Sequence, residues 1–131
     1  MKPTDLMIGD WLRYSPKSIS LNNNYGGLYR AEGVSQDTIS LGAKNYRFVV
    51  SDKEIDPIPL TAEILEKNGW EHDGIFMDKR IDENTFFSWA GKFGAELYQN
   101  NYYMCYCKYV HTLQHALRLR GFDELADNFK V

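Results

Sequence analysis

Pro57 and Pro59, in the segment "IDPIPLT", constrain the fold of this chain more than any other feature. A proline has no N–H to donate to a strand ladder, and it disfavours helical backbone in the residue before it. Two prolines separated by one residue therefore predict an extended linker. We expect this linker to join a module at 1–58 to a module at 59–131, the alternative being one compact unit.

The first module is predicted to be a small β-barrel-like structure of five short strands. Val, Ile, Tyr and Phe concentrate in runs that Gly, Asn, Ser and Asp separate, as is typical of short strands joined by turns. These runs are "DWLRYS", "GGLYRAEGV", "TISLG", "YRFVVS" and "KEIDPIPL". The segment "SPKSISLNNNYGG" is expected to form a long exposed turn at one rim.

The second module is predicted to be an antiparallel sheet with a helix at each end, which makes the fold class α+β. Thr61 is a good N-cap for a short helix at about 62–68, which Gly69 would end. Strands are expected at about 70–108, with a tight turn at Asn100–Asn101, because asparagine tolerates positive φ. A second helix is expected at about 109–120.

The run "YYMCYC" is predicted to be a central strand, covered on both faces. Strict alternation would place Tyr103, Cys105 and Cys107 on one face and Tyr102, Met104 and Tyr106 on the other. Two cysteines on the same face of one strand are poorly placed for a mutual disulfide, so we expect reduced thiols.

Charge and hydropathy exclude some functions. The net charge of −3 makes nucleic-acid binding less favourable, because that function depends on many contacts between cations and phosphates. The sequence shows no signal-peptide core and no apolar run of membrane-spanning length, so the expected location is the cytoplasm and no membrane contact is expected.

The helix "YVHTLQHALRLR" carries the most pointed polar residues. On a helical wheel His111, Gln114, His115 and Arg118 gather opposite the apolar face, where a solvated surface or a partner contact is expected. A metal pair at His111 and His115 is disfavoured, because Arg118 shares the face and no Glu follows His111. A Cys–His nucleophile is disfavoured as well, since alternating Tyr, Met and Cys indicate a buried strand. We therefore predict no catalytic, cofactor or metal residues.

The loop "LNNNYGGLYR" is the other candidate for partner contact, through Tyr25 and Tyr29. Tyrosine supplies contact area, asparagine supplies hydrogen bonds and glycine supplies freedom, as in adaptable recognition loops. The alternative interpretation is an elongated hairpin turn. If the first module instead bound single-stranded nucleic acid, Tyr14, Tyr29, Tyr46 and Arg47 would be the candidate contacts.

Three segments together resemble one family. "DLMIGDWLRY", "IDPIPLTAEILEKNGW" and "KYVHTLQHALRLRGFDEL" occur in this order in small uncharacterised proteins of Bacteroides-type gut bacteria and their phages and prophages. The resemblance spans essentially the whole chain, although only these segments are close. After Gln114 this chain has "HALRLR", where the family tends to have an aromatic-rich helical segment. The resemblance implies lineage and fold rather than an activity.

These observations predict a non-enzymatic protein-interaction module encoded by a phage or mobile element, with an unknown protein as partner and no cofactor. The alternative is a nucleic-acid-binding accessory protein. A metal-dependent enzyme is the third hypothesis.

Overall fold

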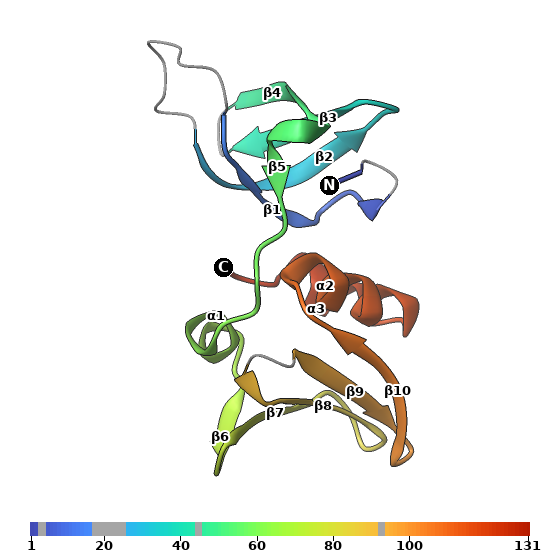
Figure 1. Cartoon of the computed structure of the whole chain (residues 1–131). Helices are drawn as coiled ribbons and strands as arrows, with labels where there is room; N and C mark the ends of the chain where they lie inside the picture. Colours follow the sequence, from blue (N-terminus) through green and yellow to red (C-terminus); the bar gives the residue numbers. More distant parts are fainter. Residues whose placement is uncertain (3–4, 17–25, 44–45, 92–93) are drawn as a thin grey trace. The chain divides into compact units, whose positions relative to one another are not determined.

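The computed structural model describes residues 1–2, 5–16, 26–43, 46–91 and 94–131. The chain divides between Ile58 and Pro59 into two compact units, Met1–Ile58 and Pro59–Val131. Within the described residues each unit contains an antiparallel five-stranded sheet, and the second also contains three α-helices (Figure 1). The predicted α+β class is therefore confirmed.

The first unit is a sheet with the strand order β4-β3-β2-β1-β5. Its long strands are antiparallel neighbours along the chain, and a single 3-10 turn, Asp52–Glu54, connects the last two. The strands are β1 (Trp11–Tyr14), β2 (Gly27–Val34), β3 (Thr38–Ala43), β4 (Tyr46–Ser51) and β5 (Ile55–Asp56).

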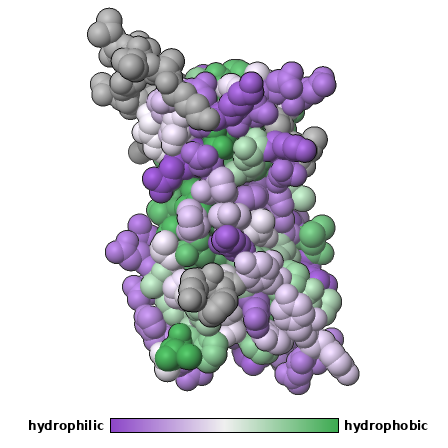
Figure 2. Space-filling view, viewed as in Figure 1, coloured by the Kyte–Doolittle hydropathy of each residue, from purple (hydrophilic) through white to green (hydrophobic). Residues whose placement is uncertain are grey.

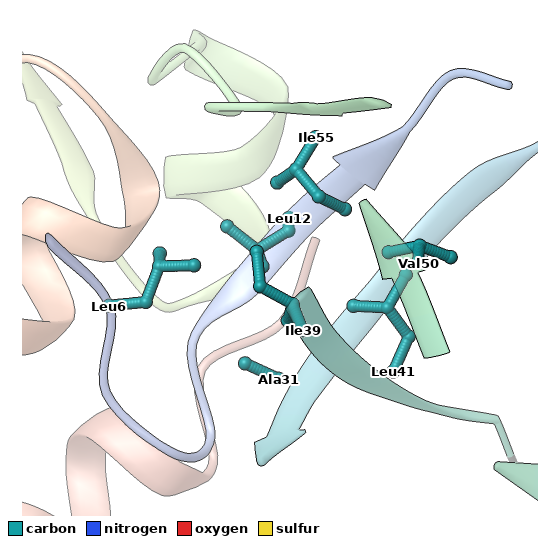
Figure 3. Packing of buried hydrophobic residues seen from close by; sticks show 7 residues of the cluster. All are labelled: Leu6, Leu12, Ala31, Ile39, Leu41, Val50 and Ile55. Carbon is teal, nitrogen blue, oxygen red and sulfur yellow. The ribbon is translucent and has the colours of Figure 1, made fainter. Parts of the chain in front are cut away.

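One face of this sheet forms the core of the first unit, because side chains alternate between the two faces of a strand. Leu12, Ile39 and Leu41 are fully buried on this face. Figure 3 shows them with the rest of the cluster, which comprises Leu6, Leu12, Ala31, Ile39, Leu41, Val50 and Ile55. Three half-buried aromatic rings extend this core, namely Tyr14, Tyr29 and Phe48.

The second unit is a sheet with the order β10-β9-β8-β7-β6, and its helices lie on one side of that sheet (Figure 1). Met77, Phe87 and Leu97 point from neighbouring strands to the helix-covered side and are buried. The elements are α1 (Ala62–Lys67), β6 (Glu71–Asp73), β7 (Phe76–Arg80), β8 (Thr85–Trp89), β9 (Ala95–Gln99), β10 (Tyr102–Cys107), α2 (Val110–Leu119) and α3 (Asp123–Asp127).

Two local signals in the second unit act as predicted. The Thr61 hydroxyl accepts a hydrogen bond from the Ile64 N–H at 3.3 Å, which confirms Thr61 as the N-cap of α1. Asn100 and Asn101 have φ values of 53° and 67°, and they form the two-residue turn between β9 and β10. Both central residues of such a turn require positive φ, which explains the choice of asparagine.

Strand β10 differs from its prediction in two ways. It is an edge strand of the sheet, and Tyr103 and Tyr106 are exposed on it, so the prediction of a central strand covered on both faces is wrong. The pairing with β9 also shifts between Tyr103 and Cys105, where Met104 is the extra residue of a β-bulge. Because one extra residue reverses the alternation, Tyr103 and Tyr106 share the outer face while Cys105 and Cys107 share the inner one.

Candidate functional site

The outer face of the second sheet carries five aromatic side chains on four strands. We call this set the aromatic face: Phe76, Phe86, Tyr98, Tyr103 and Tyr106. Tyr103 is 57% exposed and Tyr106 is 48% exposed. The described helices all lie on the opposite side of the sheet, so none of them covers this face (Figure 1).

A row of directly opposed residues runs across this face from β7 to β10. Phe86 and Tyr98 stack with their ring centroids 5.0 Å apart, and Tyr103 meets Tyr98 edge to face at 6.0 Å. The guanidinium of Arg80 lies 5.5 Å from the centroid of the Phe86 ring. Such cross-strand contacts restrict the orientations of the rings.

Carboxylates surround these rings. The Tyr98 hydroxyl donates a hydrogen bond to Glu96 Oε2 at 2.5 Å, and this bond raises the pKa of Tyr98. The register with the neighbouring strands places three more acidic residues on the same face, namely Glu71, Asp73 and Asp78. Arg80 is the cation that the described strands add to this face, so the face carries an excess of negative charge.

Hydropathy by itself does not distinguish an aromatic surface of this kind. Figure 2 shows hydrophilic and hydrophobic residues interspersed over the visible surface. Tyrosine combines a large apolar ring with a polar hydroxyl, so its hydropathy is intermediate although its ring can bury a large area in an interface. The residue types and their register therefore identify the candidate surface.

The predicted polar face of α2 is wrong for its central residues. His111 is 6% exposed and Gln114 is fully buried, and the side chain of Arg118 is 13% exposed. Helix α3 was not predicted, and the carbonyl of its Ala126 accepts a hydrogen bond from Gln114 Nε2 at 3.1 Å. Gln114 therefore bonds within the second unit and offers no surface to a partner.

Arg118 and the two histidines of this helix also have contacts within the second unit. Arg118 lies 3.6 Å from the Asp127 carboxylate of α3. His115 is half-buried, with its ring 5.6 Å from that of His111, and the His111 ring stacks on Tyr109 at 5.8 Å. Gly121 and the acidic residues Asp123 and Glu124 are a helix-stop and helix-start signal that could have revealed α3.

The third histidine, His72, and the two cysteines do not form a metal or nucleophile site within the described residues. His72 pairs with Glu66 at 2.9 Å on the exposed surface. No group of three or more His, Cys, Asp or Glu side chains within the described residues could hold a metal ion. Burial raises the pKa of Cys107 to about 12, with a smaller contribution from Cys105, so the thiol stays protonated at neutral pH and is a poor nucleophile.

Two of the candidate residues of the first unit, Tyr14 and Tyr29, lie in one aromatic cluster, and Arg47 lies on the other face of the sheet. Tyr29 lies in β2 rather than in a loop, and its ring packs edge to face on Phe48 at 5.1 Å. Tyr14 belongs to the same cluster, at 5.5 Å from Phe48. Arg47 points to the opposite face, where it pairs with Glu32 at 2.6 Å.

Tyr46 is the first residue of β4, and Tyr25 lies outside the described residues. A nucleic-acid platform made of the four candidate residues would need them on one face, and Arg47 does not share the face of Tyr14 and Tyr29.

Comparison with known proteins found no matching family model, no matching curated protein and no matching solved structure. In the described part of the chain, no helix combines the length and apolar composition that crossing a bilayer requires.

Proposed function

We propose that this chain is a non-enzymatic protein-interaction module of a phage or other mobile element, acting in the cytoplasm, and that it binds through the aromatic face. The observation that carries the proposal is the row of Phe86, Tyr98 and Tyr103, in which the rings contact one another, the first two are half-buried and Tyr103 is exposed. Tyrosine-rich surfaces with fixed rings are typical of the energetic centres of protein interfaces.

The charge of the aromatic face indicates the chemistry of the partner. Carboxylates such as Asp78 and Glu96 flank the rings, and π faces attract cations as well. A partner segment with lysine or arginine beside apolar side chains would satisfy both features. Complementary charge of this kind favours correct encounter more than it adds affinity.

Substitutions on β10 test this proposal. The double variant Tyr103→Ser/Tyr106→Ser removes two exposed rings, and Tyr102→Ser is the matched control, because Tyr102 is 74% exposed on the same strand but points to the opposite face. A protein captured from lysate of the native host by the unmodified chain is identified and purified. We expect its affinity to fall at least about thirtyfold with the double variant, as for a hot-spot loss of about 2 kcal/mol.

The control keeps the captured protein bound with nearly unchanged affinity. Equal binding by the double variant and the unmodified chain would contradict the proposal, because a partner held elsewhere does not depend on these rings.

A second candidate function is single-stranded nucleic-acid binding at the same face. The observation that favours it is the stacked pair Phe86 and Tyr98 with Arg80 beside it, since bases stack on aromatic rings. The carboxylates on this face oppose a phosphate backbone. Fluorescence anisotropy with labelled oligonucleotides tests it: binding that weakens steeply with salt and is lost in Tyr103→Ser/Tyr106→Ser supports this function, and salt-independent or absent binding removes it.

A further inference from the structure

The second unit contains a pocket of about 300 Å³ on the other side of its sheet, away from the aromatic face. Trp70 and Phe87 lie side by side in its wall with ring centroids 5.7 Å apart, and both are buried. Leu113 and Leu117 of α2 continue the apolar lining. A cavity of this size and character is suited to a small apolar body.

Three lysines from three different elements line the same pocket. Lys67 ends α1, Lys79 lies on β7 and Lys130 lies in the C-terminal segment. The Lys79 ammonium lies beside the backbone of Gly69, because a Cβ added at Gly69 would be 3.1 Å from Lys79 Nζ. None of the described lining residues is acidic, although the net charge of the chain is −3. The lining of the pocket is therefore positively charged, although the whole chain has a net negative charge.

Asn68 holds the C-terminal segment in place as one wall of the pocket. Its side-chain Nδ2 donates to the Lys130 carbonyl at 2.8 Å, and its Oδ1 accepts from the Lys130 N–H at 2.9 Å. The same Nδ2 also donates to the Ile64 carbonyl at 2.8 Å, which fixes the amide against α1. Phe129 is buried beside this clasp and lines the pocket. Specific hydrogen bonds therefore hold this wall of the pocket in place.

We infer that this pocket binds a small amphipathic anion, with an acyl or aromatic body between the helices and the sheet and a carboxylate or phosphate head among the three lysines. The apolar lining excludes a fully polar ion, and the ammonium groups disfavour a cation. The inference is independent of the aromatic face and goes beyond the proposed protein interaction.

Saturated carboxylates at concentrations below micelle formation are suitable probes. The readout is the NMR signal of the Trp70 indole N–H, because this ring lines the pocket, and the Trp11 indole of the other unit serves as the internal control. We expect saturable shifts of Trp70 with decanoate and unchanged Trp11. Affinity should rise about fourfold per CH₂ from hexanoate towards decanoate, the value that corresponds to about 0.8 kcal/mol per buried CH₂.

The head group is tested with ligands of the same body. Decanol should bind about tenfold more weakly than decanoate, since it forms no ion pair with the lysines, and decyltrimethylammonium should produce no saturable shift. Equal affinity of decanol and decanoate would overturn the assignment of an anionic ligand. The absence of any saturable shift with the whole carboxylate series would overturn the site itself.

Variants locate the binding. Leu125 lines the pocket and is 43% exposed, so Leu125→Glu adds a repelling carboxylate without disturbing the core. We expect it to weaken decanoate binding at least about tenfold. Leu119→Glu is the matched control, because Leu119 is 77% exposed and does not line the pocket. Equal losses in both variants would overturn the location.

Replacing one lysine by methionine distinguishes the effect of its charge on binding from the effect of its side-chain shape. Lys79→Met keeps the length of the side chain, and we expect decanoate to bind about three- to fivefold more weakly while decanol binds as before. Lys108→Met, at an exposed lysine outside the pocket, should leave both affinities unchanged. A loss of decanol binding in Lys79→Met equal to the loss of decanoate binding would contradict the role of the charge.

Discussion

The burial of Gln114 and the protonation state of Cys107 depend on the groups around them more than on the residue type. Glutamine is usually found on protein surfaces, yet Gln114 is fully buried. Its side-chain amide donates a hydrogen bond to the carbonyl of Ala126. Such a pairing is the condition on which a polar side chain is tolerated in a core. Cys107 shows the opposite case, an ionisable group that stays neutral because its surroundings do not solvate a thiolate.

The raised pKa of Cys107 predicts a loss of stability in alkali. The thiol of the unfolded chain titrates near 9, whereas that of the folded chain titrates near 12, so the unfolded state loses its proton first as the pH rises. Stability from this group is complete below about pH 9, and between about pH 9 and 12 it falls by about 1.4 kcal/mol per pH unit. Urea unfolding at pH 7, 9.5 and 10.5 measures this slope.

The variant Cys107→Ala should lack this contribution and show a shallower decline of stability with pH. Cys105→Ala, which removes the neighbouring half-buried thiol, is the control and should retain most of the slope, because burial is the larger cause of the shift. Identical pH profiles for Cys107→Ala and the unmodified chain would show that the Cys107 thiol is not linked to folding.

At the scale of elements, signals carried by adjacent residues could be predicted and those set by packing could not. Thr61 and the Asn100–Asn101 turn act through bonds and φ values within a few residues, so the sequence alone was sufficient. The bulge at Met104 depends on how β10 pairs with β9. The alternation of residue types along β10 alone does not indicate it. The candidate surface was missed for this reason.

The same limit applies to the last helix. A helical wheel identifies which residues share a face, and Val110, Leu113 and Leu117 of the apolar face are buried. It does not identify what packs on the other face, which here includes contacts with α3 from Gln114 and Arg118. Short helices such as α3 contribute a weak periodic signal, since five residues complete little more than one turn.

A close backbone approach at the start of β9 predicts a strong requirement for glycine. Gly94 has a φ of 80°, and a Cβ there would lie 2.7 Å from the Cys107 carbonyl oxygen and from the Tyr106 ring. Gly94→Ala should therefore combine backbone strain with overpacking and lower the free energy of unfolding by about 2–5 kcal/mol. Thermal or urea unfolding followed by circular dichroism measures the loss.

Gly91 provides the matched control for this substitution. Its φ of 65° is equally unfavourable for alanine, but no described atom lies within 4 Å of the added Cβ. Gly91→Ala should then show the strain alone, about 1–2 kcal/mol. If both variants lost the same stability, the close contact at Gly94 would have no energetic effect.

At the scale of the whole molecule, the chain consists of two units that each bury their own core. The first unit has 58 residues, and a unit of this size buries a modest fraction of its surface, so each core side chain carries a large share of its stability. Leu12→Ala, at a fully buried position of that core, should cost about 2–5 kcal/mol.

Hydrogen exchange measured by NMR can assign this loss to one unit. We expect Leu12→Ala to accelerate exchange of the amides in β2 and β3, while the amides of β8 and β9 keep their protection. Leu97→Ala, at a fully buried position of the second unit, should produce the reverse pattern. Parallel acceleration in both sheets by either variant would show that the two units unfold together.

The bulge at Met104 also limits how this protein can change in length during evolution. The Asn100–Asn101 turn fixes the start of β10, and the buried Cys107 fixes its end, so the number of residues between them decides which side chains face outwards. Loss of one residue would move either the tyrosines or the cysteines to the other side of the sheet. Insertions and deletions within this strand are therefore expected to occur in pairs among relatives that keep the aromatic face.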